Sequence, residues 1–378
     1  LVAAGASCDA RDGRQRTPLH LACCGVLEGH LLAVQTLIAN KATVNVCDKS
    51  KTSPLLFAAK AKNLSVCKCL LDAGAIPCPV NSSGRSALHE ACDCPDVVCA
   101  VIEHAHKTLQ DTSLVSEFVR KPSSSKCTAL FEACSAGNTS SIEALVNCVG
   151  ASSPLSVSGA QGPHSMTLLH VAAQAGHAEA VGLLIKLASA VHRGDIISEL
   201  EARDESLRTP LHLASIEGHV ECVELLLSAG GSVQSADSVG NTSWHFAANR
   251  GHSVVISALL RNSAVGIDTT NHCQETPLLL AATQGHLSPV QLLISANACY
   301  TTTPSDKTSP FIEAVRFNHV EVVQYLLTSS MADSCCVTTM HGGLGPMHIA
   351  ALHGGVSCLA ALRDHGRNLQ SQLANKEA

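Results

Sequence analysis

Apolar residues recur along the chain in short blocks with helical spacing. The block at 220–227 places Val220, Val223 and Leu227 three and four positions apart, and the block at 320–327 repeats this spacing. Such spacing puts apolar side chains on one face of an α-helix. We therefore predict short amphipathic helices that must stack on similar neighbours, because no single unit can bury both of its faces.

A hexamer typified by TPLHLA, which begins at Thr17, recurs along nearly the whole chain. Its ten copies begin at Thr17, Ser53, Ser86, Thr128, Thr167, Thr209, Thr242, Thr276, Ser309 and Gly345. The intervals between these positions are 36, 33, 42, 39, 42, 33, 34, 33 and 36 residues, so the shortest period is 33. A fixed period of this length indicates a protein built from stacked repeats.

The hexamer has the composition of a helix start. Thr or Ser can cap the first free amides, and Pro at the next position loses no hydrogen bond there. A turn follows about five residues later, as at Gly218-His219, where Gly permits the positive φ that reverses the chain. Twelve histidines fit this pattern as structural residues, six in the hexamer and six in the turn, namely His20, His89, His170, His212, His245, His348, and His30, His177, His219, His252, His286, His319.

The Thr-Pro-Leu-His-x-Ala hexamer with its period of 33 residues resembles the ankyrin repeat. This resemblance implies an all-α solenoid of helix–turn–helix units with β-turn fingers between them. We expect a single array over 1–378, with a partial repeat in 1–12, about ten repeats in 13–366, and the approach to a further repeat or a tail in 367–378. The chain is then expected to be a stretch of a longer array.

Three consecutive long intervals add residues near 106–126, 150–165 and 188–205, after second helices, where the resemblance places the fingers. In ankyrin-like proteins the fingers and the concave helical face commonly form the partner groove, so these insertions are the first candidate site. Tolerated surface insertion explains the same lengths equally well, because long loops cost little closure entropy. The candidate partner-binding residues are Lys107, Arg120, Lys121, His192, Arg193 and Asp195.

Composition narrows the function. The formal charge of −6 and the lack of a basic run argue against nucleic acid as the partner. No apolar stretch reaches the ~20 residues of a membrane span, so we expect no membrane contact by this segment. Nineteen cysteines, an odd number, are scattered through apolar segments and indicate reduced thiols in a cytoplasmic or nuclear protein.

No catalytic signature, phosphate-binding loop or cofactor motif is present, and we predict a non-enzymatic chain without cofactor. The densest Cys/His cluster contains His89, Cys92, Cys94, Cys99, His104 and His106. We expect no metal there, because His89 already belongs to a hexamer and no second Cys pair has zinc spacing. Asn45 resembles the finger asparagine that an oxygen-dependent hydroxylase modifies in some ankyrin proteins, and is the modification candidate.

These observations predict a scaffold or adaptor that binds a protein or peptide through its concave face and finger loops, and that is monomeric as a fragment. Two alternatives stay open, because repeat folds serve unrelated partners. One is the cytosolic ankyrin domain of a membrane channel or transporter. The other is a targeting module fused to an enzyme such as a ubiquitin ligase.

Overall fold

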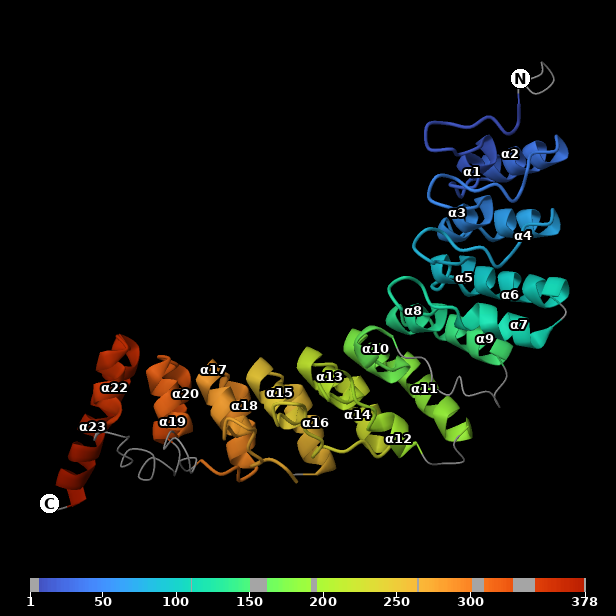
Figure 1. The fold of residues 1–378 in the computed structure, drawn as a ribbon. Coiled ribbons are helices and arrows are strands. Elements are labelled where there is room, and N and C mark those ends of the chain that lie inside the picture. Colours follow the sequence, from blue (N-terminus) through green and yellow to red (C-terminus); the bar gives the residue numbers. More distant parts are fainter. Residues whose placement is uncertain are drawn as a thin grey trace. The chain divides into compact units, whose positions relative to one another are not determined.

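The structure is a computed structural model that describes residues 7–109, 111–149, 162–191, 196–263, 265–300, 309–328 and 344–376. The chain divides into two compact units, Leu1–Glu205 and Ser206–Ala378. Throughout the described ranges the regular elements are helices joined by turns (Figure 1). The prediction of an all-α repeat fold is confirmed, whereas the division of the chain into one array with the boundaries above stays a prediction.

The described residues of unit 1 form five helix pairs and three additional short elements. The first helices of the pairs are α1 (Pro18–Ala22), α3 (Pro54–Lys60), α5 (Ala87–Glu90), α8 (Ala129–Ser135) and α10 (Leu168–Ala175). The second helices are α2 (Glu28–Ala39), α4 (Leu64–Asp72), α6 (Pro95–Leu109), α9 (Thr139–Val149) and α11 (Ala178–Val191). The additional elements are α7 (Thr112–Arg120), the 3-10 turn η2 (Pro163–Ser165) and α12 (Ile197–Leu200).

Unit 2 also has five pairs in the part of it that the structure describes. Its first helices are α13 (Pro210–Glu217), α15 (Ser243–Arg250), α17 (Pro277–Gln284), α19 (Pro310–Arg316) and α22 (Pro346–Leu352). Its second helices are α14 (Val220–Ser228), α16 (Ser253–Asn262), α18 (Leu287–Ser295), α20 (Val320–Thr328) and α23 (Val356–Lys376). Within each unit, first helices pack on first helices and second helices on second helices, so each unit has two layers.

Every first helix begins directly after the first residue of a hexamer, as the sequence predicts. In the six copies that carry histidine, the backbone N–H of the capping residue donates to the histidine Nδ1 at 2.9–3.2 Å. The Nε2 of four of these rings lies 2.8–3.1 Å from a backbone carbonyl 23 to 38 residues further along, and in three of them this carbonyl belongs to the residue directly before the next hexamer. The ring is therefore neutral with its proton on Nε2, and it joins one repeat to the next.

The turn histidines make the opposite connection. In four of them the ring Nε2 lies 2.8–3.1 Å from a carbonyl in the first helix of the preceding repeat, namely in His177, His252, His286 and His319. The glycine before three of these histidines, and before His219, ends the first helix with φ near 80°, a conformation that suits Gly. Hexamer histidines thus bond four repeats to the following repeat, and turn histidines bond four repeats to the preceding one.

The prediction for His30 was wrong. Gly29 and His30 lie inside the first turn of α2, whereas the turn histidines of later repeats precede the second helix. The His30 ring instead lies against Gly25, where an added Cβ would come within 2.1 Å of Nε2. Asn63 connects α4 to this region, because its side-chain amide donates to the Gly25 carbonyl at 3.0 Å. The three extra residues of the first interval therefore lengthen the turn before α2.

Candidate partner-binding surface

The segments between helix pairs form tight fingers. In unit 1 the fingers are residues 12–16, 48–52, 81–85 and 123–127, and in unit 2 they include 237–241 and 271–275. In each finger the N–H of the first residue donates to the carbonyl of the fifth at 2.8–3.0 Å, and the N–H of the fourth donates to the carbonyl of the first at 2.8–3.1 Å. These are β-turns closed by a backbone pair, so the predicted β-turn fingers are confirmed.

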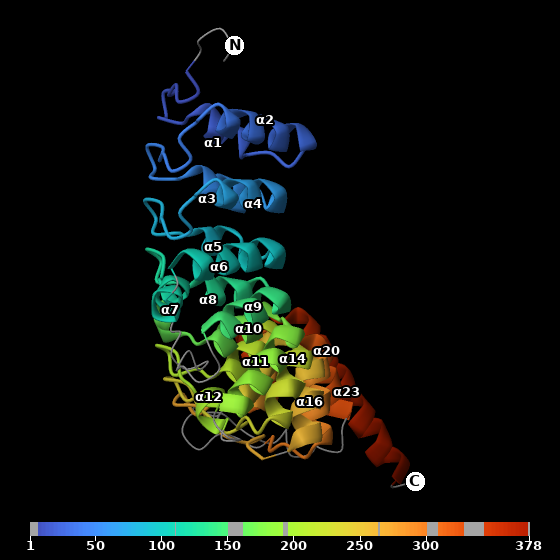
Figure 2. The ribbon, with the colours of Figure 1, turned by 90° about the vertical axis from the view of Figure 1, so that its right-hand side faces the viewer.

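Neighbouring fingers are also bonded to each other. In unit 1 the Lys49 N–H donates to the Arg14 carbonyl at 3.0 Å, Ser82 donates to Ser50 at 2.8 Å, and Ser124 donates to Ser83 at 2.9 Å. We call this series of bonds the finger ladder, and Figure 2 shows the turns of the first repeats on the side of α1, α3 and α5 that lies away from α2, α4 and α6.

Unit 2 has the same kind of bonds between its own fingers. The Ser238 N–H donates to the Ser206 carbonyl at 3.0 Å, and the His272 N–H donates to the Val239 carbonyl at 2.9 Å. The side chains at the finger tips differ between the two units. Unit 2 presents Leu207 and Val239, each 45% exposed, whereas three of the four unit 1 fingers named above present an exposed Lys or Arg and the finger 81–85 presents serines. Because the ladder fixes the spacing of these side chains, a partner would bind them with little ordering of the backbone.

The structure corrects the prediction of a loop insertion at 106–126. Its central segment is the helix α7, capped by Asp111, whose Oδ1 accepts the Ser113 N–H at 2.8 Å. Val115, Phe118 and Val119 are buried where α7 packs on α6 and α9. Removing 106–126 would therefore expose apolar surface, and the insertion is integral to unit 1.

Three of the predicted site residues lie at this helix. Lys107 is exposed in the last turn of α6, Arg120 is half-buried at the end of α7, and Lys121 is exposed just after it. Lys121 is brought together with apolar side chains in a groove of about 210 Å³, which we call the α7 groove, lined by Cys78, Leu109, Leu114, Glu117, Phe118 and Lys121.

The other two insertions are only partly described. His192, Arg193 and Asp195 lie outside the described residues, as does most of the segment 150–165. The described portion of 188–205 is the end of α11 and the short α12, with Leu200 buried. This insertion, too, contributes helix rather than only loop.

One polar cluster on unit 1 was not predicted from the sequence. The Arg85 guanidinium donates to the Glu90 carboxylate at 2.9 Å and to both oxygens of the Glu132 carboxylate at 2.6 and 2.9 Å. Burial acts to lower the pKa of Arg85, but the two carboxylates outweigh it and raise the pKa. The only sequence signal is a glutamate at the fifth hexamer position in two consecutive copies, since seven of the other eight copies carry an apolar residue there and only the copy at Ser309 has a glutamate, Glu313.

Asn45 is held by the following repeat. Its side-chain N–H donates to the Gly74 carbonyl at 2.9 Å, and its side-chain oxygen accepts the Ile76 N–H at 3.0 Å. Asp9 has a similar role in the preceding repeat, through the N–H and hydroxyl of Thr43. These bonds give Asn45 a structural role, and its hydroxylation stays a prediction.

The Cys/His cluster does not converge. His89 is bonded to Ser86 and to the Cys127 carbonyl, and the His106 Nε2 lies 3.5 Å from the Cys148 thiol. Within the described ranges, no group of three or more His, Cys, Asp and Glu side chains is placed to hold a metal ion. Burial raises the pKa of the Cys92 thiol to about 11, so it is a poor thiolate ligand.

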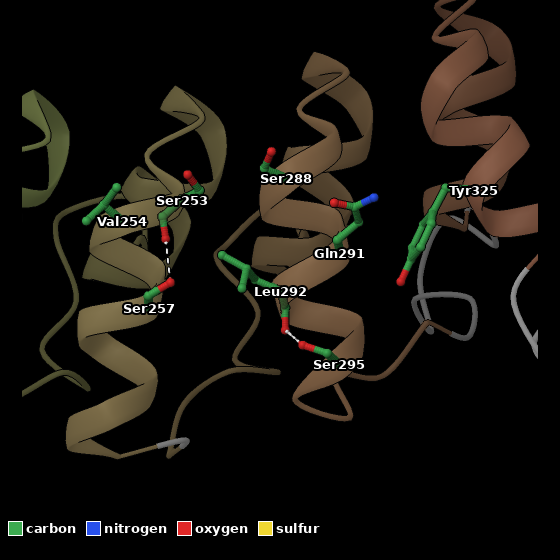
Figure 3. Close-up of a pocket in the computed structure, with 8 residues that line it drawn as sticks. All are labelled: Ser253, Val254, Ser257, Ser288, Gln291, Leu292, Ser295 and Tyr325. Carbon is green, nitrogen blue, oxygen red and sulfur yellow. Dashed lines mark hydrogen bonds between the residues drawn. The ribbon is translucent and has the colours of Figure 1, made fainter.

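A larger hollow of about 520 Å³ lies on the second helices of unit 2. Its lining, shown in Figure 3, consists of Ser253, Val254, Ser257, Ser288, Gln291, Leu292, Ser295 and Tyr325. The Ser257 and Ser295 hydroxyls donate to carbonyls of their own helices at 3.0 and 2.8 Å. The lining contains no His, Asp, Glu or Lys that would activate a serine, so this hollow has no nucleophile–base pair.

Comparison with known proteins places these features in a family. The profile described as "Ankyrin repeats (3 copies)" matches residues 1–76, 19–111, 110–195, 155–237, 187–273 and 231–304. The E3 ubiquitin-protein ligase XBAT33 of Arabidopsis thaliana is 27% identical over 157 residues, which cover 35% of this chain and 30% of that protein. The Transient receptor potential cation channel subfamily A member 1 of Drosophila melanogaster is 26% identical over 199 residues, which cover 51% of this chain and 16% of that protein.

A shorter match is the Ankyrin repeat and KH domain-containing protein mask-1 of Caenorhabditis elegans, 33% identical over 90 residues, which cover 24% of this chain and 3% of that protein. The chain thus spans less than a third of the length of each of these relatives. Among the described residues, no helix has the length and apolar character needed to cross a bilayer. The family match extends over residues 1–304, well beyond half of the sequence. The chain therefore belongs to the ankyrin repeat family.

Proposed function

We propose that this chain is a protein-binding scaffold that presents its finger side to a partner protein or peptide. Ankyrin repeats are non-catalytic interaction modules, which makes a protein partner the expected ligand class. The observation that carries the proposal is the finger ladder, which holds the tips of successive repeats in a fixed series by backbone bonds of 2.8–3.0 Å in both units. A rigid, repeated surface of this kind suits an extended contact.

The α7 groove supports a second contact on the same unit. Leu114 is 46% exposed there beside Lys121, and an apolar side chain next to a charged one suits the place where the apolar core of an interface meets its polar rim. Few aromatic residues are available as anchors, since the chain has only nine. The contact is accordingly proposed to be extended and largely polar.

The test is photocrosslinking with the whole chain in a lysate of its native cells. A photoreactive amino acid replaces Ser82 or Ser125 at the finger tips, or Lys68 or Glu143 on the second helices, all four of which are exposed. We expect the tip positions to crosslink a discrete protein and the second-helix positions to crosslink none. Equal crosslinking from both faces, or crosslinking from the second helices alone, would overturn the proposal.

The two alternatives concern the protein to which such an array belongs. The match to a ubiquitin ligase favours a targeting module, and the match to a cation channel favours a regulatory or tethering domain. Both would use the chain itself as a non-catalytic binding surface. Sequencing the complete transcript would separate them, since a channel requires several apolar segments of about 20 residues and a ligase requires a catalytic domain.

A further inference from the structure

The finger tips of unit 1 concentrate positive charge on a chain that is acidic overall. The fingers at 12–16, 48–52, 81–85 and 123–127 contain six Lys or Arg residues but only two Asp. Both aspartates are bound within their own fingers: Asp12 accepts the Arg14 and Arg16 N–H groups, and Asp48 accepts the Ser50 and Thr52 N–H groups. They are therefore used in forming the turns.

Two of the basic residues are likewise engaged. Arg16 is paired with Asp12 at 2.8 Å, and Arg85 with its two glutamates. The other four, Arg14, Lys49, Lys51 and Lys126, are exposed and do not enter the ion pairs of the described residues. These four side chains, which we call the basic tips, project from a surface whose backbone is already ordered.

The finger ladder sets the spacing of the basic tips. The backbone route from one finger to the next crosses one hydrogen bond of the finger ladder, which separates two Cα atoms by about 5 Å. It then follows one peptide unit of about 3.8 Å. Successive fingers are thus about 9 Å apart. An extended chain advances about 3.3 Å per residue, so it covers this distance in about three residues.

We propose that the basic tips bind an extended, acidic segment of a partner protein whose carboxylates follow the fingers, about three residues apart between neighbouring fingers and about six residues apart across the finger 81–85, where the basic residue Arg85 is already paired. This inference rests on the proposed scaffold function and names the chemistry of its partner. Carboxylates would pair with Arg14 on the first finger, with Lys49 and Lys51 on the second, and with Lys126 on the fourth. A protein segment is favoured over single-stranded nucleic acid, because the fingers of unit 1 contain no Phe, Tyr or Trp on which bases could stack.

The test measures binding of a fluorescent peptide with glutamate at every third position to the whole chain, by anisotropy at low ionic strength. We expect saturable binding that weakens as salt is added. The same peptide with glutamine in place of glutamate should not bind. The double variant Lys49→Glu, Lys51→Glu should weaken binding about tenfold or more, since two attractive pairs become repulsive.

The matched control is the double variant Lys68→Glu, Lys186→Glu, which changes the net charge equally at exposed positions of α4 and α11. It should bind the peptide within about twofold of wild type. Equal weakening by both double variants would overturn the inference, because it would show an effect of net charge alone. So would tighter binding of a single-stranded oligonucleotide of the same charge. Failure of the peptide to bind while finger crosslinks to a cellular protein persist would overturn the acidic partner and leave the scaffold function standing.

Discussion

Replacing His245 by alanine tests the role of the hexamer histidine. The ring is 1% exposed. Its Nδ1 accepts the Thr242 N–H at 3.1 Å and lies 2.9 Å from the Thr242 hydroxyl, and its Nε2 donates to the Glu275 carbonyl at 3.0 Å. Each bond contributes about 1 kcal/mol, and the truncation also leaves a cavity and buried polar groups without partners. We therefore expect the free energy of unfolding of unit 2 to fall by about 3 kcal/mol.

The same site predicts a dependence of stability on pH. Burial lowers the pKa of His245 from its ordinary value of 6.5, against the opposing effect of the carbonyl it is bonded to. As the pH falls below about 6.5, the unfolded chain takes up a proton that the folded chain does not, so stability decreases by up to about 1.4 kcal/mol per pH unit until the lowered pKa is reached. The pKa values of His20 and His89 are lowered for the same reason, so unit 1 should respond in the same direction.

The assay uses Trp244, the only tryptophan of the chain, whose side chain is fully buried beside His245. Urea unfolding followed by its fluorescence, at about pH 7.5 and at about pH 5.5, reports on this repeat directly. The exposed finger histidine His272 provides the control, and His272→Ala should leave the free energy of unfolding within about 0.5 kcal/mol of wild type. A loss below about 1 kcal/mol for His245→Ala, or equal wild-type stability at both pH values, would refute the reasoning.

Three further predictions concern unit 1. Arg85→Ala should reduce the free energy of unfolding by about 1–3 kcal/mol, because two half-buried carboxylates lose their partner, and a smaller loss in chemical unfolding would show that water replaces it. Asn45→Ala should cost about 1–2 kcal/mol through two lost bonds to the next repeat, and hydrogen exchange should show faster exchange of the Ile76 amide. The double variant Leu114→Ser, Lys121→Ala should leave thermal unfolding nearly unchanged but weaken partner capture severalfold, and unaltered capture would exclude the α7 groove as a binding site. Deleting 106–126 should instead destabilise unit 1.

The helix starts could be located from the sequence because a cap is a local feature. Thr or Ser at the first hexamer position and Pro after it determine where the helix begins, whatever lies around them. His30 was misplaced because a turn lengthened by three residues changes which residue enters the helix first. The helix α7 was missed although its signals were present, with Asp111 as a cap and Val115, Phe118 and Val119 at helical spacing.

The binding surface was less predictable. The finger ladder joins backbone atoms of residues whose side chains follow no common pattern, two basic residues at Lys49 and Arg14 but a histidine and a valine at His272 and Val239, so the sequence does not predict it. The contact of Arg85 with Glu132 spans 47 residues and depends on how two repeats stack. Lys121 was identified as a candidate from its position in an insertion, whereas its neighbours in the α7 groove come from α6, from α7 and from Cys78, which lies between α4 and the finger 81–85.

The forward and backward histidine bonds make each repeat interchangeable with the next. Excising one whole period, 242–275, would bring the hexamer at Thr276 directly after Asn241. His286, which now donates to the Asn249 carbonyl, would then meet the Ile216 carbonyl that His252 now uses. The Ile216 carbonyl would thus keep a histidine donor, whereas removing only half a period, 242–258, would take His252 away without placing another turn histidine one period further along. Arrays of this kind can therefore gain or lose length in whole units during evolution without first passing through an unstable form.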